Sequence, residues 1–258
     1  MHLPLQRIIS FLQNPIMPLR VRLQGQVKNF DMYLPYLHGK SGLEIGGPSA
    51  IFRKRRALPV YEQVEKLDNC DFSPSTVWAK HTQSFVFNPR KAPGKTLFCD
   101  GSALADIPDQ TYDFLLSSHN LEHFANPVKA LREWHRVLKS DGALILVLPY
   151  YLGTFDRRRL PTSVDHMFSD WDKNIGEDDL THLPEILDKH DLSMDPAAGN
   201  LNQFHKRSLD NKLNRCLHHH VFDEHNSREL LSRSGFEVLS FAFRLPFNLC
   251  FLARKISS

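Results

Sequence analysis

The sequence predicts an α/β fold, a doubly wound domain built around a seven-stranded, mostly parallel sheet. Between residues 41 and 150, short apolar runs alternate with segments of helical periodicity. A glycine turn follows the first apolar run, and the run at 143–149 is apolar throughout. Continuous apolar runs are typical of parallel strands buried on both faces, and strand–helix alternation indicates a doubly wound sheet.

The first five strands are predicted at residues 42–45, 64–68, 96–100, 112–118 and 143–149. The turn Gly46-Gly47-Pro48-Ser49 is expected to open a helix through Ile51. Asn126 and Pro127 form an N-cap and first-turn pair for a second helix, which is expected to stop before the turn signal at residues 141–142.

The rest of the chain is organised differently. Residues 152–217 are polar with helical periodicity, which predicts a helical lid inserted at the edge of the sheet where strands end and ligands bind. A helix near 227–234 and strands at 236–243 and 249–254 follow, the last strand being antiparallel. Residues 1–40 form a partly helical leader, and residues 41–258 one domain that carries the lid.

Composition excludes several classes of protein. The 258 residues are 41% hydrophobic and 24% charged, a globular balance, and no apolar run is long enough to cross a membrane. The net charge of +3 and the short basic runs at 53–56 and 157–159 do not predict a nucleic-acid partner. Four widely spaced cysteines and the lack of a signal-peptide pattern suit a cytoplasmic protein. The oligomeric state is left open.

Acidic or polar residues follow several predicted strands. The Gly46-Gly47 turn follows the first strand, and Asp68 ends the second, 22 positions after Gly46, a spacing at which a carboxylate can bind ribose hydroxyls. Asp100-Gly101 ends the third strand and Ser118-His119 the fourth. The carboxyl ends of parallel strands share one edge, so this edge is the predicted binding site.

The stretch from Leu43 to Pro149 resembles the class I S-adenosylmethionine-dependent methyltransferases, of Rossmann-like fold, especially the small-molecule branch known as type 11. The resemblance rests on residues 43–47, Asp68, 100–101, 107–114, 118–124 and 131–142. It implies that Glu44, Gly46 and Gly47 hold the methionine part of S-adenosylmethionine. It also implies that Asp68 binds the ribose. Pro48 and Ser49 depart from the family, which usually has another glycine there.

The same resemblance implies further cofactor contacts and a reaction. Asp100 and Gly101 would lie beside the adenine, with Ser118 and His119 at the same edge. The implied reaction is methyl transfer to a small-molecule or glycan acceptor, for which we expect O-methylation. A hydroxyl acceptor needs a base, and a histidine near its ordinary pKa can serve at neutral pH. The candidate bases are His119, His166, His182 and His220.

Other functions stay open. The chain could be a non-catalytic cofactor-binding module of the same fold. His119, Glu122 and His123 also fit the H-x-x-E-H motif of zinc peptidases, which would make the protein a metal-dependent hydrolase. The glycine spacing does not fit a nicotinamide dehydrogenase. A metal site in the lid is a further alternative, with ligands drawn from His166, Asp178, Asp179, His182 and the run 218–220.

Overall fold

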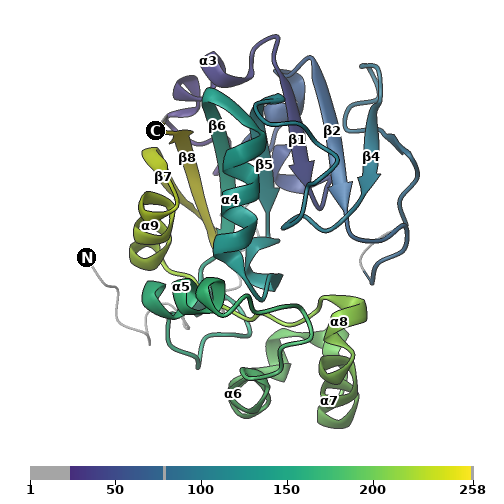
Figure 1. Cartoon of the computed structure of the whole chain (residues 1–258), viewed down its shortest axis with the longest axis vertical. Coiled ribbons are helices and arrows are strands. Elements are labelled where there is room, and N and C mark those ends of the chain that lie inside the picture. Colours follow the sequence, from purple (N-terminus) through teal and green to yellow (C-terminus); the bar gives the residue numbers. More distant parts are fainter. Residues whose placement is uncertain (1–23, 78–79, 257–258) are drawn as a thin grey trace.

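The computed structural model describes residues 24–77 and 80–256, so most of the predicted leader, residues 1–23, lies outside the described residues. Its remainder holds the 3₁₀ turn Phe30–Met32 and the short α-helix α3 (Leu34–Leu37). The described chain forms one mixed sheet with the strand order β3-β4-β2-β1-β5-β6-β8-β7 (Figure 1). The strands are β1 (Ser41–Ile45), β2 (Lys66–Asp71), β3 (Ser84–Phe85), β4 (Gly94–Phe98), β5 (Tyr112–Ser118), β6 (Leu138–Pro149), β7 (Phe236–Arg244) and β8 (Asn248–Lys255).

The predicted fold class is confirmed, with one additional strand. Strands β1, β2, β4, β5 and β6 pair in parallel, and β8 pairs antiparallel with both β6 and β7, as expected for the last strand. The eighth strand is β3, a two-residue segment that pairs antiparallel with the edge strand β4. A segment this short carries no period-2 pattern, so no local signal predicts it.

Two predicted elements are misplaced. The second strand runs from Lys66 to Asp71 instead of over 64–68, so Asp68 lies in mid-strand. The helix expected after the glycine turn is only the 3₁₀ turn Ala50–Phe52. The exposed residues that follow it, 53–56, are all basic, and like charges three or four positions apart oppose a helix.

Helices cover one face of the sheet, and the other is covered by the N-terminal segments. On the first face lie α4 (Pro127–Val137), α5 (Val164–Asp172) and α9 (Glu224–Arg233). Asn126 caps α4 by accepting a hydrogen bond from the Lys129 amide, as predicted, but the helix ends at Val137 and β6 begins at once. Successive β6 side chains alternate between the faces: Leu144 packs with these helices and Ile145 with Phe30 and Tyr33. The sheet is therefore buried on both faces.

Residues 152–217 are helical, as predicted. They include α5, α6 (Leu183–Lys189), α7 (Leu201–Leu209) and α8 (Asn211–Asn214). Helices α6 to α8 lie beyond the carboxyl ends of β1, β2 and β4 (Figure 1). They have a small hydrophobic cluster of their own, which contains Leu183, Ile186 and Phe204. This segment therefore covers the edge where the predicted site residues gather.

Candidate active site

The glycine turn after β1 forms one wall of a cavity of about 610 Å³ at the carboxyl edge of the sheet. Gly46 has φ +73°, and a Cβ at this position would lie 2.3 Å from Nδ2 of Asn120. The Gly47 amide donates a 2.8 Å hydrogen bond to Oδ1 of Asn69, a buried residue of β2. Only glycine fits the position of residue 46 without backbone strain and collision. The sequence had not singled out Asn69, because its partner is 22 residues away.

Glu44 supports this turn from behind. Its carboxylate is fully buried, accepts a 3.0 Å hydrogen bond from the Ser49 amide and a 2.7 Å bond from the Tyr61 hydroxyl, and does not line the cavity. Burial raises the pKa of Glu44 to about 7, although the bonds from Ser49 and Tyr61 oppose the rise. In this structure Glu44 therefore holds the loop, and the glycines present the loop backbone to the cavity.

Asp71 is the acidic residue that β2 brings to the cavity. Because the strand ends at Asp71, its carboxylate lines the cavity, where Nε2 of His81 lies 3.1 Å from Oδ2. Burial raises the pKa of Asp71, and His81 opposes the rise. The placement of Asp68 at the strand end is wrong. Its carboxylate accepts hydrogen bonds from the Lys95 amide at 2.8 Å and the Tyr112 hydroxyl at 3.0 Å, outside the cavity.

Asp100 and Gly101 line the cavity, as expected. Asp100 accepts hydrogen bonds from the amide and hydroxyl of Ser102, both at 2.8 Å, and from Arg215 at 3.0 Å. Burial raises the pKa of Asp100, but these partners outweigh burial, so its pKa lies below the ordinary value. A Cβ on Gly101 would lie 2.9 Å from Ile45 and 3.0 Å from Phe124. The side chains of Ile45 and Phe124 therefore leave no room for a side chain at residue 101.

Arg215 connects the helical segment to this edge. Its guanidinium pairs with Asp100 at 3.0 Å and with Glu177 at 2.9 Å, and the residue lines the cavity. Glu177 also accepts a 3.2 Å hydrogen bond from the Ala125 amide. Nothing in the sequence around Arg215 indicated this role, because all its partners are distant along the chain.

His119 lines the cavity, as predicted, whereas Ser118 does not. The Asn248 side chain donates to the Arg244 carbonyl at 3.2 Å, so its Oδ1 faces His119 and accepts a 2.8 Å bond from Nε2–H. The Nδ1 atom lies 3.9 Å from the Glu122 carboxylate. Ser118 still ends β5, but its side chain is not part of the cavity wall.

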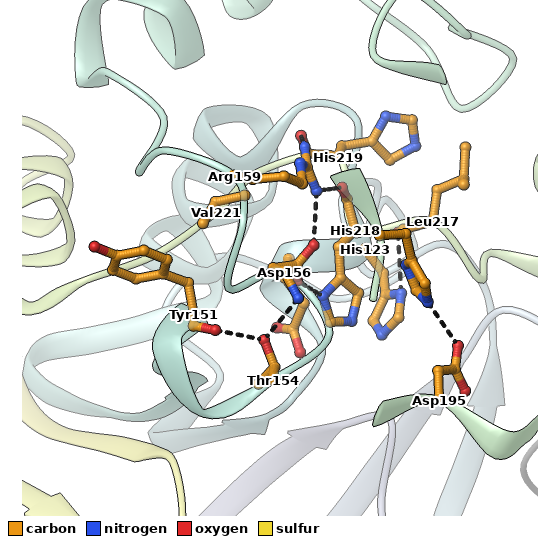
Figure 2. Close-up of polar contacts among 12 residues, drawn as sticks. His123, Tyr151, Thr154, Asp156, Arg159, Asp195, Leu217, His218, His219 and Val221 are labelled. Atoms are coloured by element: carbon orange, nitrogen blue, oxygen red, sulfur yellow. Dashed lines mark hydrogen bonds and ion pairs between the residues drawn. The ribbon is translucent and has the colours of Figure 1, made fainter. Parts of the chain in front are cut away.

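Two histidines that the sequence did not predict as bases, His123 and His218, also line the cavity. Figure 2 shows them with their polar contacts. His218 donates from Nδ1 to Oδ2 of Asp156 at 2.6 Å, and Asp156 binds Arg159 at 2.9 Å. His123 donates from Nδ1 to the Leu217 carbonyl at 3.1 Å. We call His119, His123 and His218 the cavity histidines.

The histidine–aspartate pair shifts both pKa values. Burial lowers the pKa of His218, but the Asp156 carboxylate outweighs burial and raises it above the ordinary value of 6.5. Burial likewise opposes ionisation of Asp156, but His218 and Arg159 hold its pKa below the ordinary range. The imidazole is thus oriented and charge-stabilised by one buried carboxylate, with Nε2 of the neutral ring left as an acceptor.

The other three predicted bases, His166, His182 and His220, do not line the cavity. We call them the lid histidines. Nε2 of His166 lies 3.1 Å from Nε2 of His182, and Nε2 of His220 lies 3.2 Å from the Ala125 carbonyl. Their expected role as bases for methyl transfer therefore has no support in the structure, because no lid histidine reaches the cavity wall.

The zinc-peptidase alternative does not fit the geometry. That motif needs both histidines on one helix, whereas His119 precedes the 3₁₀ turn Leu121–His123 and has φ +51°. Of the three motif residues, Glu122 and His123 approach His218 instead, their potential ligand atoms lying within 4.8 Å of one another.

Within residues 24–77 and 80–256, no helix has the length and apolar character needed to cross a bilayer.

Comparison with known proteins identifies the domain. Residues 45–146 match the family model described as a methyltransferase domain. Three similar crystal structures are S-adenosylmethionine-dependent methyltransferases from Mesorhizobium loti and Methanosarcina mazei, and a 1,6-didemethyltoxoflavin N1-methyltransferase from Burkholderia thailandensis with bound S-adenosylhomocysteine. No curated protein matches the sequence significantly.

The structural likeness extends over most of each chain. The Mesorhizobium enzyme is 14% identical with a TM-score of 0.51, and 88% of this chain and 96% of that chain are covered. The Methanosarcina enzyme is 15% identical with a TM-score of 0.50, and 88% of this chain and 98% of that chain are covered. The Burkholderia enzyme is 14% identical with a TM-score of 0.50, and 98% of this chain and 87% of that chain are covered. At these identities the likeness concerns the fold.

The fold, the edge cavity and the family match define one class of enzyme. Residues 45–146 form a methyltransferase domain, within the fold of class I S-adenosylmethionine-dependent methyltransferases. S-adenosylmethionine is its cofactor. The residues of the edge fit this ligand: the cavity volume lies in the range of about 300–1,000 Å³ typical of cofactor sites. Gly46 and Gly101 both line this cavity, and at each position a Cβ would collide with a neighbouring side chain.

Proposed function

We propose that this enzyme methylates a hydroxyl oxygen of a small-molecule or glycan acceptor, and that His218 is the general base. The observation that carries the proposal is the 2.6 Å bond by which Nδ1 of His218, a residue of the cavity wall, is held by the buried Asp156. An unprotonated amine can attack without a base, whereas a hydroxyl gains from losing its proton as it reacts. A histidine held by a buried carboxylate supplies that function.

We also propose how the chain holds its cofactor. The turn Gly46-Gly47 and the carboxylates of Asp71 and Asp100 would contact it, because these residues line the cavity together. When bound, S-adenosylmethionine supplies a methyl group that its sulfonium already activates. The chain's own task is to hold the acceptor in line, to exclude water and to accept the hydroxyl proton at Nε2 of His218. A cytoplasmic location belongs to this proposal and is supported by four cysteines that form no disulfide.

His119 is the other candidate base, since its Nε2–H bond to Asn248 leaves Nδ1 able to accept a proton. The two candidates predict different pH profiles. The Asp156 carboxylate raises the pKa of His218, so protonated His218 is inactive at low pH, and kcat/KM should rise through an apparent pKa above 6.5. Asp156→Asn removes the negative charge and leaves burial, so the rising limb should move to lower pH.

The experiment begins with an acceptor. Methyl-labelled S-adenosylmethionine is incubated with nucleotide-linked sugars, free hexoses and phenols, and with a matched set of primary amines. Label on oxygen supports the proposal, and label only on nitrogen contradicts O-methylation. With the acceptor found, His218→Gln should lower kcat by about 100-fold or more. If Asp156→Asn leaves the profile unmoved while His119→Gln abolishes the rising limb, His119 is the base. Unchanged affinity for S-adenosylhomocysteine checks that each variant is folded.

A further inference from the structure

The lid histidines form a compact cluster with Asp170, outside the cavity. His166 and Asp170 lie four residues apart on α5 and so share one face of that helix, His182 immediately precedes α6, and His220 lies shortly before α9. One nitrogen of each histidine and one oxygen of Asp170 all lie within 4.8 Å of one another. Three segments of the chain thus place four potential metal ligands around one point.

The distances in the cluster match a tetrahedral ion. His166 Nε2 lies 3.1 Å from His182 Nε2 and 3.4 Å from Asp170 Oδ2, and His220 Nε2 lies 3.6 Å from the same oxygen. Zinc binds histidine nitrogen and carboxylate oxygen at about 2.0–2.2 Å, so neighbouring ligands of a tetrahedral site lie about 3.3–3.6 Å apart. Only small side-chain movements are needed to bring the four atoms to those positions.

One ligand atom of the cluster, Oδ2 of Asp170, lacks the hydrogen-bond partner that burial demands. The Asp170 side chain is 9% exposed, and its Oδ2 accepts no hydrogen bond of good geometry. Nε2 atoms of His166 and His182 face each other at 3.1 Å, where two lone pairs would repel unless a proton or a cation lies between them. A cation at the centre of the cluster would satisfy all of these groups at once.

We propose that His166, Asp170, His182 and His220 bind one Zn²⁺ ion. Three imidazoles and one carboxylate are a donor set that suits Zn²⁺, and four protein ligands leave no position for a substrate, so the site is structural. The ion replaces the contact between His220 Nε2 and the Ala125 carbonyl, and it joins α5, the start of α6 and residue 220. Since the exposed fraction of the His166 side chain is 43%, the ion can enter from that side.

The site has a consequence for the lid. His220 lies two residues after His218, and Asp170 accepts a 3.1 Å bond through its carbonyl from Asn126, the residue that caps α4. A metal bound here therefore fastens the helical segment to the methyltransferase domain beside the cavity. The proposal does not depend on the acceptor or on the identity of the base.

The test uses the purified full-length protein. After dialysis against a chelator and then against metal-free buffer, Zn²⁺ is titrated and the bound metal is measured by mass spectrometry after gel filtration. We expect one Zn²⁺ per chain. Co²⁺ in its place should give the visible absorption of a tetrahedral ion. His166→Gln is the main variant because this side chain is the most exposed ligand, and the exposed His225→Gln on α9 is its control.

The His166→Gln variant should bind Zn²⁺ more than about 100-fold more weakly than the wild type. Mutation of residues that only hydrogen-bond to metal ligands already lowers metal affinity by about 10- to 100-fold. The control should bind Zn²⁺ as the wild type does. Absence of stoichiometric zinc together with absence of the Co²⁺ signal overturns the proposal. Zinc that is lost with His123→Gln and retained with His166→Gln also overturns it, because the ion would then sit in the cavity near Glu122 and His218. Chelation should lower the midpoint temperature of thermal unfolding of the wild type. It should not change the midpoint temperature of His166→Gln.

Discussion

The cavity histidines and the lid histidines show how differently one residue type is used within a single chain. His218 and His220 are two positions apart, yet His218 bonds to Asp156 in the cavity wall, whereas His220 faces Asp170 and the lid cluster. The cavity histidines lie beside the glycine turn and the strand-end acids, where we propose that the cofactor binds. The lid histidines lie beside one another and Asp170, where we propose that a Zn²⁺ ion binds. The surroundings of each ring, and not its place in the sequence, decide its chemistry.

The largest effect should come from the glycine turn, which belongs to the cavity side of this comparison. Gly46→Val should weaken S-adenosylhomocysteine binding by more than about 100-fold, or about 2.7 kcal/mol. The valine side chain would collide with the Asn120 side chain, and the backbone at φ +73° is strained for any residue with a Cβ. Isothermal titration calorimetry measures the affinity.

The matched control for this variant is Gly39→Val. Gly39 has a similar φ of +68°, but a Cβ there meets nothing within 4 Å. It therefore reproduces the backbone strain of Gly46→Val away from the cavity and should retain normal affinity. Equal affinities for the two variants would mean that the cofactor does not bind against this turn.

A smaller effect is expected from the acid at the end of β2. Asp71→Asn should weaken S-adenosylhomocysteine binding by roughly 10- to 150-fold, which corresponds to the about 1.5–3 kcal/mol of a hydrogen bond to a charged group. Asp68→Asn is the control, because Asp68 is bound to Lys95 and Tyr112 outside the cavity. If Asp68→Asn weakens binding and Asp71→Asn does not, the proposed contact between Asp71 and the cofactor is wrong.

The smallest effect on catalysis should come from the lid histidines. His166→Ala should leave S-adenosylhomocysteine affinity unchanged and lower kcat by less than about tenfold, whereas a missing base costs about 100-fold or more. The physical reason is distance from the chemistry, since His166 is not part of the cavity wall. Steady-state kinetics of His166→Ala beside His218→Gln make the comparison. A greater loss of kcat in His166→Ala than in His218→Gln would mean that the base does not lie in the cavity wall.

The elements that the sequence predicted well are those whose signal is local. The strand β5 has the predicted bounds, and the continuous apolar run of β6 is buried on both faces. The cap Asn126 acts within one helical turn of itself. By contrast, β2 extends to Asp71 through Asn69, a polar residue that is buried because it accepts a bond from Gly47. No local pattern distinguishes such a residue from one in a loop.

The sequence by itself determined the fold class, the glycine turn and the positions of Asp100 and His119, because in a parallel sheet whatever follows each strand must gather at one edge. Only the tertiary structure decided which acid of β2 reaches that edge, and which histidines enter the cavity. His218 meets Asp156 across 62 residues, and the lid cluster draws its ligands from separate segments. Such pairings depend on how the helical segment packs against the sheet edge. Burial and opposing charge then set the pKa of each group, and these are properties of the folded chain alone.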